Sequence, residues 1–107
     1  MIQVFRYQTS DGREPLTDWL AALRDKQAQA KLRIRLKRLE AGLLGDCESV
    51  GDGVFELREH LGAGYRVYFG RHGQTVVILL CAGSKTTQAA DVRIAKAYWA
   101  DWKRRQA

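Results

Sequence analysis

One apolar segment, residues 75–81, constrains the fold of this chain more than any other feature. It reads TVVILLC and contains five consecutive aliphatic side chains. Such a run is typical of a central strand covered on both faces, because both sets of alternating side chains are then buried. The chain has 107 residues, and two separate cores would each bury too little apolar surface. We therefore expect residues 1–107 to form a single domain built around a sheet.

Three other segments have the composition of strands. Residues 1–7 contain several apolar side chains and precede the turn-forming sequence TSDG. Residues 54–59 and 65–69 alternate apolar and polar side chains, which is the period of a strand with one buried face. Tight turns at residues 61–64 and 71–74 join these strands to one another and to the apolar run.

Three segments predict helices. Pro15 suits the first turn of a short helix that runs to Leu23, because its fixed φ matches the helix and its missing N–H needs no partner there. Residues 26–43 form the second helix, which Gly42 and Gly45 would end. Its apolar stripe comprises Ala28, Leu32, Leu36, Leu39 and Leu43.

The last helix would be capped by Ser84, Thr86 or Thr87. Its apolar face comprises Ile94, Ala95, Tyr98 and Trp102, with Trp99 beside it. The resulting order is β-α-α-β-β-β-α. We predict an α+β fold in which two N-terminal helices and a C-terminal helix pack against one face of an antiparallel meander.

The charge balance favours an acidic or polyanionic partner. Lys and Arg number 18 against 12 for Asp and Glu, which gives a net charge of +6. Much of the positive charge lies in the second helix, where Lys31, Arg35 and Arg38 are candidate RNA contacts, since neutralised phosphates release counterions. A solvated face or the binding of an acidic protein would explain the same charges.

Other features narrow the class of protein. Residues 1–7 lack the basic start and apolar core of a signal peptide, and no apolar run reaches membrane-spanning length, so we expect a cytoplasmic protein without membrane contact. Cys47 and Cys81 are isolated from each other and from any His cluster. We expect reduced thiols, with Cys81 buried, and neither a metal site nor a cofactor.

The two alternating strands indicate where chemistry could occur. Glu56 and Arg58 point away from the apolar face of the first strand, as do Arg66 and Tyr68 on the second, and antiparallel pairing would bring these four side chains together. Lys85 follows the next strand and would lie at the rim of this patch. Cross-strand ion pairs on a solvated sheet face would produce the same pattern without any catalytic function.

These residue types suit RNA cleavage by attack of a 2′-hydroxyl on the neighbouring phosphate. Arg58, Arg66 and Lys85 would hold the phosphate and stabilise the charge that develops on it. Tyr68 is a candidate for substrate orientation or proton transfer, and Glu56 is a candidate base. No metal ion is required for such a reaction.

The histidines and tryptophans carry a weaker functional signal. His72 lies in a predicted turn, where we expect a surface residue, whereas His60 lies near the end of the strand that carries Glu56 and Arg58 and keeps a possible role. The three tryptophans, Trp19, Trp99 and Trp102, are expected to pack in the core or between helices.

Three ordered sequence blocks resemble the RelE/ParE toxin superfamily and, within it, the HigB-like addiction module killer group. These blocks are GVFELR at residues 53–58, GYRVYF at residues 64–69 and AGSKTTQ at residues 82–88, the last followed by Asp91. Trp19, Leu20 and residues 39–45 with Asp46 are similar to that group too, so the resemblance covers nearly the whole chain. Ser84 is a departure, because this group often has an acidic residue before the lysine, and that weakens any proposal of a carboxylate partner for Lys85.

The resemblance implies a RelE-like α+β toxin with a basic, metal-independent site that an antitoxin neutralises. Many members of the superfamily cut mRNA on the ribosome, and the matching site positions here are Arg58, residues 64–68 and residues 85–88. The implied antitoxin is a helix-turn-helix protein from an adjacent gene, and operator DNA would be contacted only through the antitoxin complex. Two alternatives remain: a ParE-like inhibitor of DNA gyrase, and a protein that retains only antitoxin or operator binding.

Overall fold

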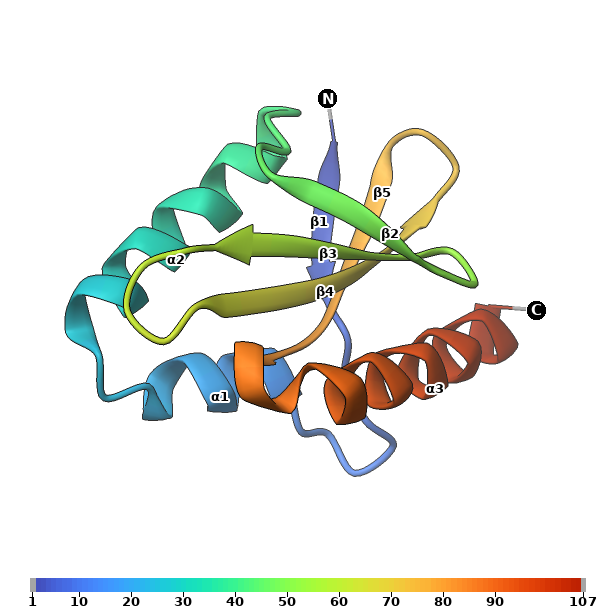
Figure 1. The fold of residues 1–107 in the computed structure, drawn as a ribbon. Helices are drawn as coiled ribbons and strands as arrows, with labels where there is room; N and C mark the ends of the chain where they lie inside the picture. Colours follow the sequence, from blue (N-terminus) through green and yellow to red (C-terminus); the bar gives the residue numbers. More distant parts are fainter. Residues whose placement is uncertain (1, 107) are drawn as a thin grey trace.

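The computed structural model describes residues 2–106 (Figure 1). Met1 of the predicted first strand and Ala107 of the predicted domain lie outside the described residues. The elements follow one another as β1 (Gln3–Arg6), α1 (Pro15–Ala22), α2 (Lys26–Glu40), β2 (Cys47–Gly51), β3 (Val54–Glu59), β4 (Tyr65–His72), β5 (Val76–Ser84), a 3-10 turn η1 (Lys85–Thr87) and α3 (Gln88–Gln106). Every predicted helix and strand is present, and the fold is α+β with one additional strand, β2.

The five strands form one mixed sheet in the order β1-β5-β4-β3-β2. Strands β2 to β5 pair antiparallel, but β1 runs parallel to β5, with Val4 opposite Val77. The prediction of a wholly antiparallel sheet is therefore wrong. The two helices that follow β1 carry the chain away from this edge of the sheet, so β1 is not constrained by a hairpin to run antiparallel to its neighbour.

Strand β2 occupies a segment for which the sequence analysis predicted no helix or strand. It pairs with β3 at the other edge of the sheet, and a tight turn with positive φ at Gly51, Asp52 and Gly53 joins the two strands. Glu48 and Ser49 are exposed, because an edge strand needs few apolar side chains. The apolar alternation that predicts a strand is therefore missing from its sequence.

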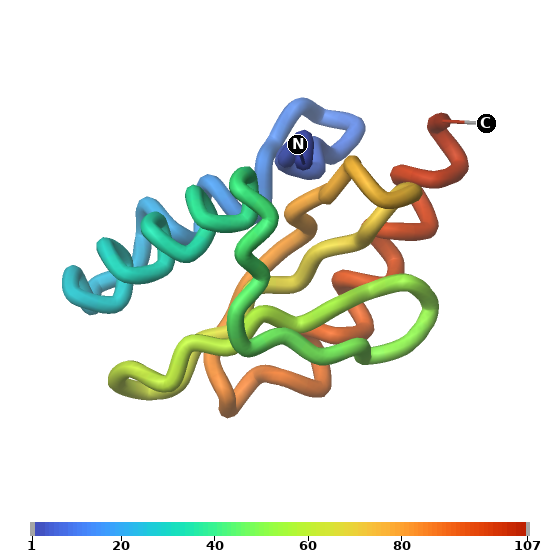
Figure 2. Tube along the Cα trace, turned by 90° about the horizontal axis from the view of Figure 1, so that it is seen from above, coloured from blue at the N-terminus to red at the C-terminus, as the bar shows by residue number. Residues whose placement is uncertain are grey.

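Helices cover both faces of the sheet, and each face has its own core (Figure 2). Helices α1 and α2 pack on one face, where Val77 and Leu79 of β5 point, while α3 packs on the other face, where Ile78 and Leu80 point. The prediction that all helices lie against one face is wrong. The apolar run itself requires this result, because its alternate side chains would otherwise face water on one side.

Helix α2 begins at an N-cap, Asp25, whose side chain accepts a hydrogen bond from the Ala28 N–H at 3.0 Å. Four members of the predicted stripe are buried, as expected. Leu43 is not part of it, because the helix ends at Glu40, Gly42 adopts a φ of +82°, and Leu43 is 59% exposed.

Helix α3 packs on the sheet through Ala95 and Trp99, while Ile94, which was predicted to face the core, is exposed. The Trp99 indole lies so close over Gly70 of β4 that a Cβ at this position would be 2.3 Å from the ring. Gly70 therefore lets α3 approach the sheet closely. This close approach buries the β4 residues that lie beneath the helix. None of the helices within residues 2–106 has the length and apolarity that crossing a membrane requires.

Candidate functional site

Antiparallel pairing of β3 and β4 brings the predicted polar residues into register. Arg58 lies opposite Arg66, and Glu56 lies opposite Tyr68. Their apolar neighbours Leu57 and Val67 point to the other face, into the core beneath α1 and α2. The period of two in the sequence therefore predicts the facing of these strands correctly.

The site itself is a small pocket of about 90 Å³ at the end of β3 and the start of β4. Three predicted residues, Arg58, Arg66 and Lys85, line it. The complete lining is Arg58, Glu59, His60, Gly64, Tyr65, Arg66 and Lys85. Lys85 is fixed at the rim because its backbone N–H donates to the Gly64 carbonyl at 2.8 Å. The fold thus gathers three cations from β3, β4 and η1 around one opening.

Arg58 is held by two carboxylates of the preceding segment. Its Nη2 lies 3.0 Å from Asp46 Oδ1, and its Nη1 lies 2.7 Å from Glu48 Oε2. All three side chains are partly exposed, so these pairs are screened by solvent and exchangeable with an incoming anion. Hydrogen bonds from His60 and then from Arg58 hold the pKa of Asp46 below its usual range.

Arg66 is more enclosed, with 14% of its side chain exposed. Its Nε lies 3.2 Å from Glu56 Oε1, yet neither Nε nor Nη1 makes a well-aligned hydrogen bond to any group within residues 2–106. Glu56 is 3% exposed and accepts a hydrogen bond from Gln88 Nε2 at 2.8 Å. The buried carboxylate therefore neutralises Arg66 while leaving part of its donor capacity unused.

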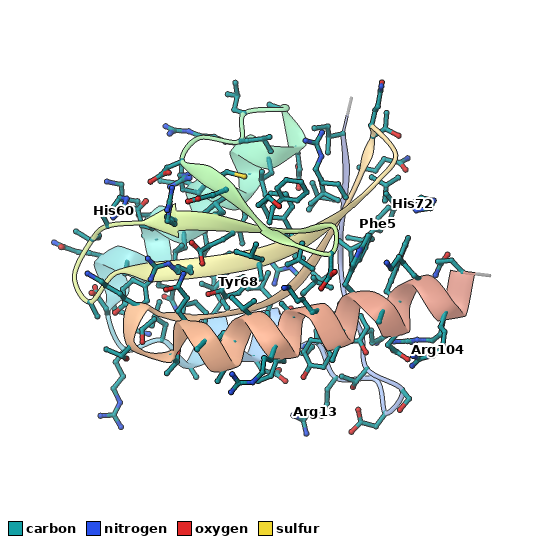
Figure 3. The ribbon with its side chains drawn as sticks, turned by 45° about the vertical axis from the view of Figure 1, so that its right-hand side comes forward. Phe5, Arg13, His60, Tyr68, His72 and Arg104 are labelled. Carbon is teal, nitrogen blue, oxygen red and sulfur yellow. The ribbon has the colours of Figure 1, made fainter. Side chains whose placement is uncertain are left out.

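Tyr68 and Glu56 do not reach the pocket. Tyr68 is fully buried in the core beneath α3 (Figure 3), and its hydroxyl has no hydrogen-bond partner among the described residues. Burial, followed by the charge of Glu56, raises the pKa of Tyr68. This position does not favour the predicted role of Tyr68 in orienting RNA or moving protons, and the buried Glu56 carboxylate contacts Arg66 and Gln88, so both roles stay predictions.

The two histidines lie far apart (Figure 3). His72 is exposed, as predicted, and its ring meets the edge of Trp102 with the centroids 5.3 Å apart. His60 lies at the end of β3 with its side chain 76% exposed, and its Nε2 is 2.7 Å from Asp46 Oδ2. Of the two, only His60 belongs to the pocket.

The three predicted RNA contacts on α2 differ in their surroundings. Lys31 is 57% exposed and lies 4.0 Å from Glu59, and Arg38 is exposed. Arg35 is only 13% exposed, because its Nη1 donates to the Arg58 carbonyl at 2.7 Å and lies 3.4 Å from Glu59 Oε1. Arg35 therefore fastens α2 to the end of β3, and its guanidinium is largely enclosed.

Alternation within the strands did not reveal the side chains that complete the site. Asp46 and Gln88 come from outside β3 and β4, yet they contact Arg58 and Glu56 directly. Gln88 and Asp46 both belong to segments that carry the family resemblance, which was the available signal. Within residues 2–106, no three His, Cys, Asp or Glu side chains gather as metal ligands would, and Cys47 and Cys81 are free thiols.

The fold and the pocket describe a small basic α+β protein with a cationic opening at one end of its sheet. The family model described as Phage derived protein Gp49-like (DUF891) matches residues 18–99, a range that includes the whole pocket. The chain belongs to this Gp49-like family, which is a toxin-type family of addiction module killers.

The chain is similar to a protein of Haemophilus influenzae (strain ATCC 51907 / DSM 11121 / KW20 / Rd). The two proteins are 50% identical over 78 residues, which are 73% of this chain and 79% of the Haemophilus protein. That protein is described as an uncharacterized protein. This comparison therefore gives no evidence for a particular reaction.

Proposed function

We propose that this protein is the toxin of a toxin–antitoxin pair and cleaves messenger RNA on the ribosome as a RelE/HigB-type endoribonuclease. The 2′-hydroxyl of the RNA attacks the adjacent phosphate, and the protein supplies positioning and charge without a metal ion. Membership of a toxin-type family supports the toxin role, and the pocket supports the reaction.

The observation that carries the proposal is the gathering of Arg58, Arg66 and Lys85 around one small opening. Arginine binds phosphate through planar pairs of N–H donors, and lysine adds a mobile positive charge. Such groups stabilise the additional negative charge of a pentavalent phosphorus transition state. The Nε and Nη1 of Arg66 are buried, so Arg66 would contact a phosphate through the part of its side chain that is exposed, which is 14%.

The basic surface of α2 would extend the RNA contact beyond the pocket. Glu59 lines the pocket and also lies 4.0 Å from Lys31, so this end of α2 adjoins the opening. Lys31 and Arg38 both line a shallow groove that also includes Ile34 and Leu61. We propose that Lys31 and Arg38 contact backbone phosphates of mRNA or ribosomal RNA, while Arg35 acts through the structure of the site.

The proposed partner that restrains this activity is an antitoxin encoded beside the toxin. The net charge of +6 favours its neutralisation by an acidic segment. This antitoxin would be a helix-turn-helix protein, and contact with operator DNA would occur only through it.

Primer extension on cellular mRNA after brief induction tests the proposal. The variants are wild type, Lys85→Ala in the pocket, and Arg13→Ala as a charge-matched control, since both side chains are exposed and their removal leaves the two cores intact. We expect cuts within translated regions for wild type and Arg13→Ala, and their loss in Lys85→Ala.

Two results would contradict the proposal. Equal cutting by Lys85→Ala would remove the pocket as the active site. Growth arrest with intact mRNA and induced DNA damage signalling would instead favour the ParE-like inhibition of DNA gyrase, and harmless expression without antitoxin would favour a protein that retains only partner binding.

A further inference from the structure

The pocket contains a histidine–carboxylate pair in addition to its cations. His60 Nε2 lies 2.7 Å from Asp46 Oδ2, and the other oxygen of the same carboxylate accepts from Arg58 Nη2 at 3.0 Å. Asp46 precedes β2 and His60 follows β3, so the pairing of these two strands brings them together. The His60 ring is 76% exposed and lines the opening shared by Arg66 and Lys85.

We propose that His60 is a catalytic residue that takes the proton from the attacking 2′-hydroxyl, and that Asp46 is a positioning residue that holds the His60 ring. This inference rests on the proposed ribonuclease function. It assigns proton transfer to a residue outside the Arg58, Arg66, Lys85, Tyr68 and Glu56 set that the strand pattern indicates.

The geometry fixes which ring nitrogen is available. An ionised carboxylate can only accept a hydrogen bond, so Nε2 carries the proton that is donated to Asp46. In neutral His60 the other nitrogen, Nδ1, then has a lone pair that is free to accept a proton. Hydrogen bonds from His60 and Arg58 keep the pKa of Asp46 below its usual range, so the carboxylate remains ionised at neutral pH.

The other groups around the opening are poorly placed to act as a base. Arg58, Arg66 and Lys85 are cations whose use is to hold phosphate. Glu59 is buried and lies between Arg35 and Lys31, at 3.4 Å and 4.0 Å. Glu56 and Tyr68 lie behind the pocket under α3. His60 is the exposed member of the lining whose side chain type accepts protons near neutral pH.

The 2′-oxygen forms a bond to phosphorus as its proton passes to Nδ1 of His60, which becomes an imidazolium stabilised by Asp46. The bond from phosphorus to the 5′-oxygen breaks, and that oxygen takes a proton from solvent. The products are a 2′,3′-cyclic phosphate and a 5′-hydroxyl, and His60 returns its extra proton to solvent.

Single-turnover cleavage of a short mRNA bound to purified ribosomes tests the inference. We compare wild type with His60→Gln and use His72→Gln as the matched control, because His72 is an exposed histidine outside the pocket. We expect the rate constant to fall at least about 100-fold in His60→Gln, the usual contribution of a positioned acid or base. Ribosome affinity, measured by co-sedimentation, and the activity of His72→Gln should remain at wild-type values.

Two further readouts separate a catalytic role from a structural one. Added imidazole should partly restore cleavage by His60→Gly, because it replaces the missing ring. Asp46→Asn removes the ionised carboxylate that accepts from Nε2 and holds the ring, so its rate constant should fall while its ribosome affinity stays at the wild-type value.

Failure of this inference is distinguishable from failure of the proposed function. If wild type does not cleave programmed mRNA, the ribonuclease proposal itself is wrong. If wild type cleaves while His60→Gln cleaves at the same rate and imidazole has no effect on His60→Gly, only the assignment of His60 is overturned.

Discussion

Removing Arg66 should destabilise the fold as well as the proposed reaction, because its buried partner would lose its counter-charge. Glu56 is 3% exposed and is held by Arg66 at 3.2 Å and by the neutral Gln88 amide at 2.8 Å. In Arg66→Met the carboxylate would keep only the amide hydrogen bond. Breaking one partner of a buried ion pair costs about 3–5 kcal/mol of unfolding free energy.

We expect the low end of that range, about 3 kcal/mol, because Arg66 itself retains 14% exposure and water can reach part of the pair. For a domain of this size the corresponding loss in Tm is about 12 °C. The double variant Glu56→Gln/Arg66→Met removes both charges and keeps an acceptor for Gln88. It should recover to within about 1 kcal/mol of wild type.

Urea unfolding at neutral pH, followed by tryptophan fluorescence, measures all three proteins. Trp99 is buried beneath the sheet and reports the loss of the α3 core. The reasoning is refuted if Arg66→Met costs less than about 1 kcal/mol, or if the double variant is as unstable as the single one. Confirmation would also mean that inactivity of Arg66→Met or Arg66→Ala alone is not evidence for a catalytic role.

Three other predictions follow from the packing. Tyr68→Phe removes a buried hydroxyl that has no hydrogen-bond partner within residues 2–106. The free energy of unfolding in urea should therefore change by at most about 1 kcal/mol, and mRNA cleavage should persist. Loss of cleavage would return Tyr68 to the active site. Burial raises the pKa of the Cys81 thiol to about 12. At pH 8 an aromatic disulfide reagent should therefore label Cys47 in the folded protein and Cys81 only after unfolding. Equal labelling rates for the two thiols in the folded protein would contradict the burial of Cys81. Gly70→Ala would place a Cβ 2.3 Å from the Trp99 ring and should cost about 1–3 kcal/mol or more, which a wild-type unfolding midpoint would contradict.

Local sequence patterns predicted the elements that have a strong period. The bounds of β3 agree with the alternating segment 54–59, and the buried positions of α2 agree with its apolar stripe except at Leu43. Strand β2 escaped prediction because an exposed edge strand has no buried face to impose alternation. The parallel placement of β1 depends on long-range pairing with β5, which no local pattern encodes.

The candidate site was predictable to a similar depth. Strand period was enough to place Arg58 beside Arg66, and the position of Lys85 directly after the next strand placed it at the rim of the same patch. The burial of Tyr68 follows from the close approach of α3 to Gly70, which is a property of tertiary packing. The contact between Asp46 and His60 likewise arises only when β2 pairs with β3. Because β2 is not apparent in the sequence, the sequence does not predict this contact.

The chemistry of the cut ends tests the central claim most directly. Purified protein is added to ribosomes programmed with an all-ribose mRNA or with the same mRNA carrying a single 2′-deoxy nucleotide at the cleavage position. We predict cleavage of the all-ribose mRNA alone, with a 2′,3′-cyclic phosphate on the upstream fragment and a 5′-hydroxyl on the downstream fragment. Cleavage of the 2′-deoxy mRNA, or fragments ending in a 3′-hydroxyl and a 5′-phosphate, would contradict attack by the RNA's own 2′-hydroxyl.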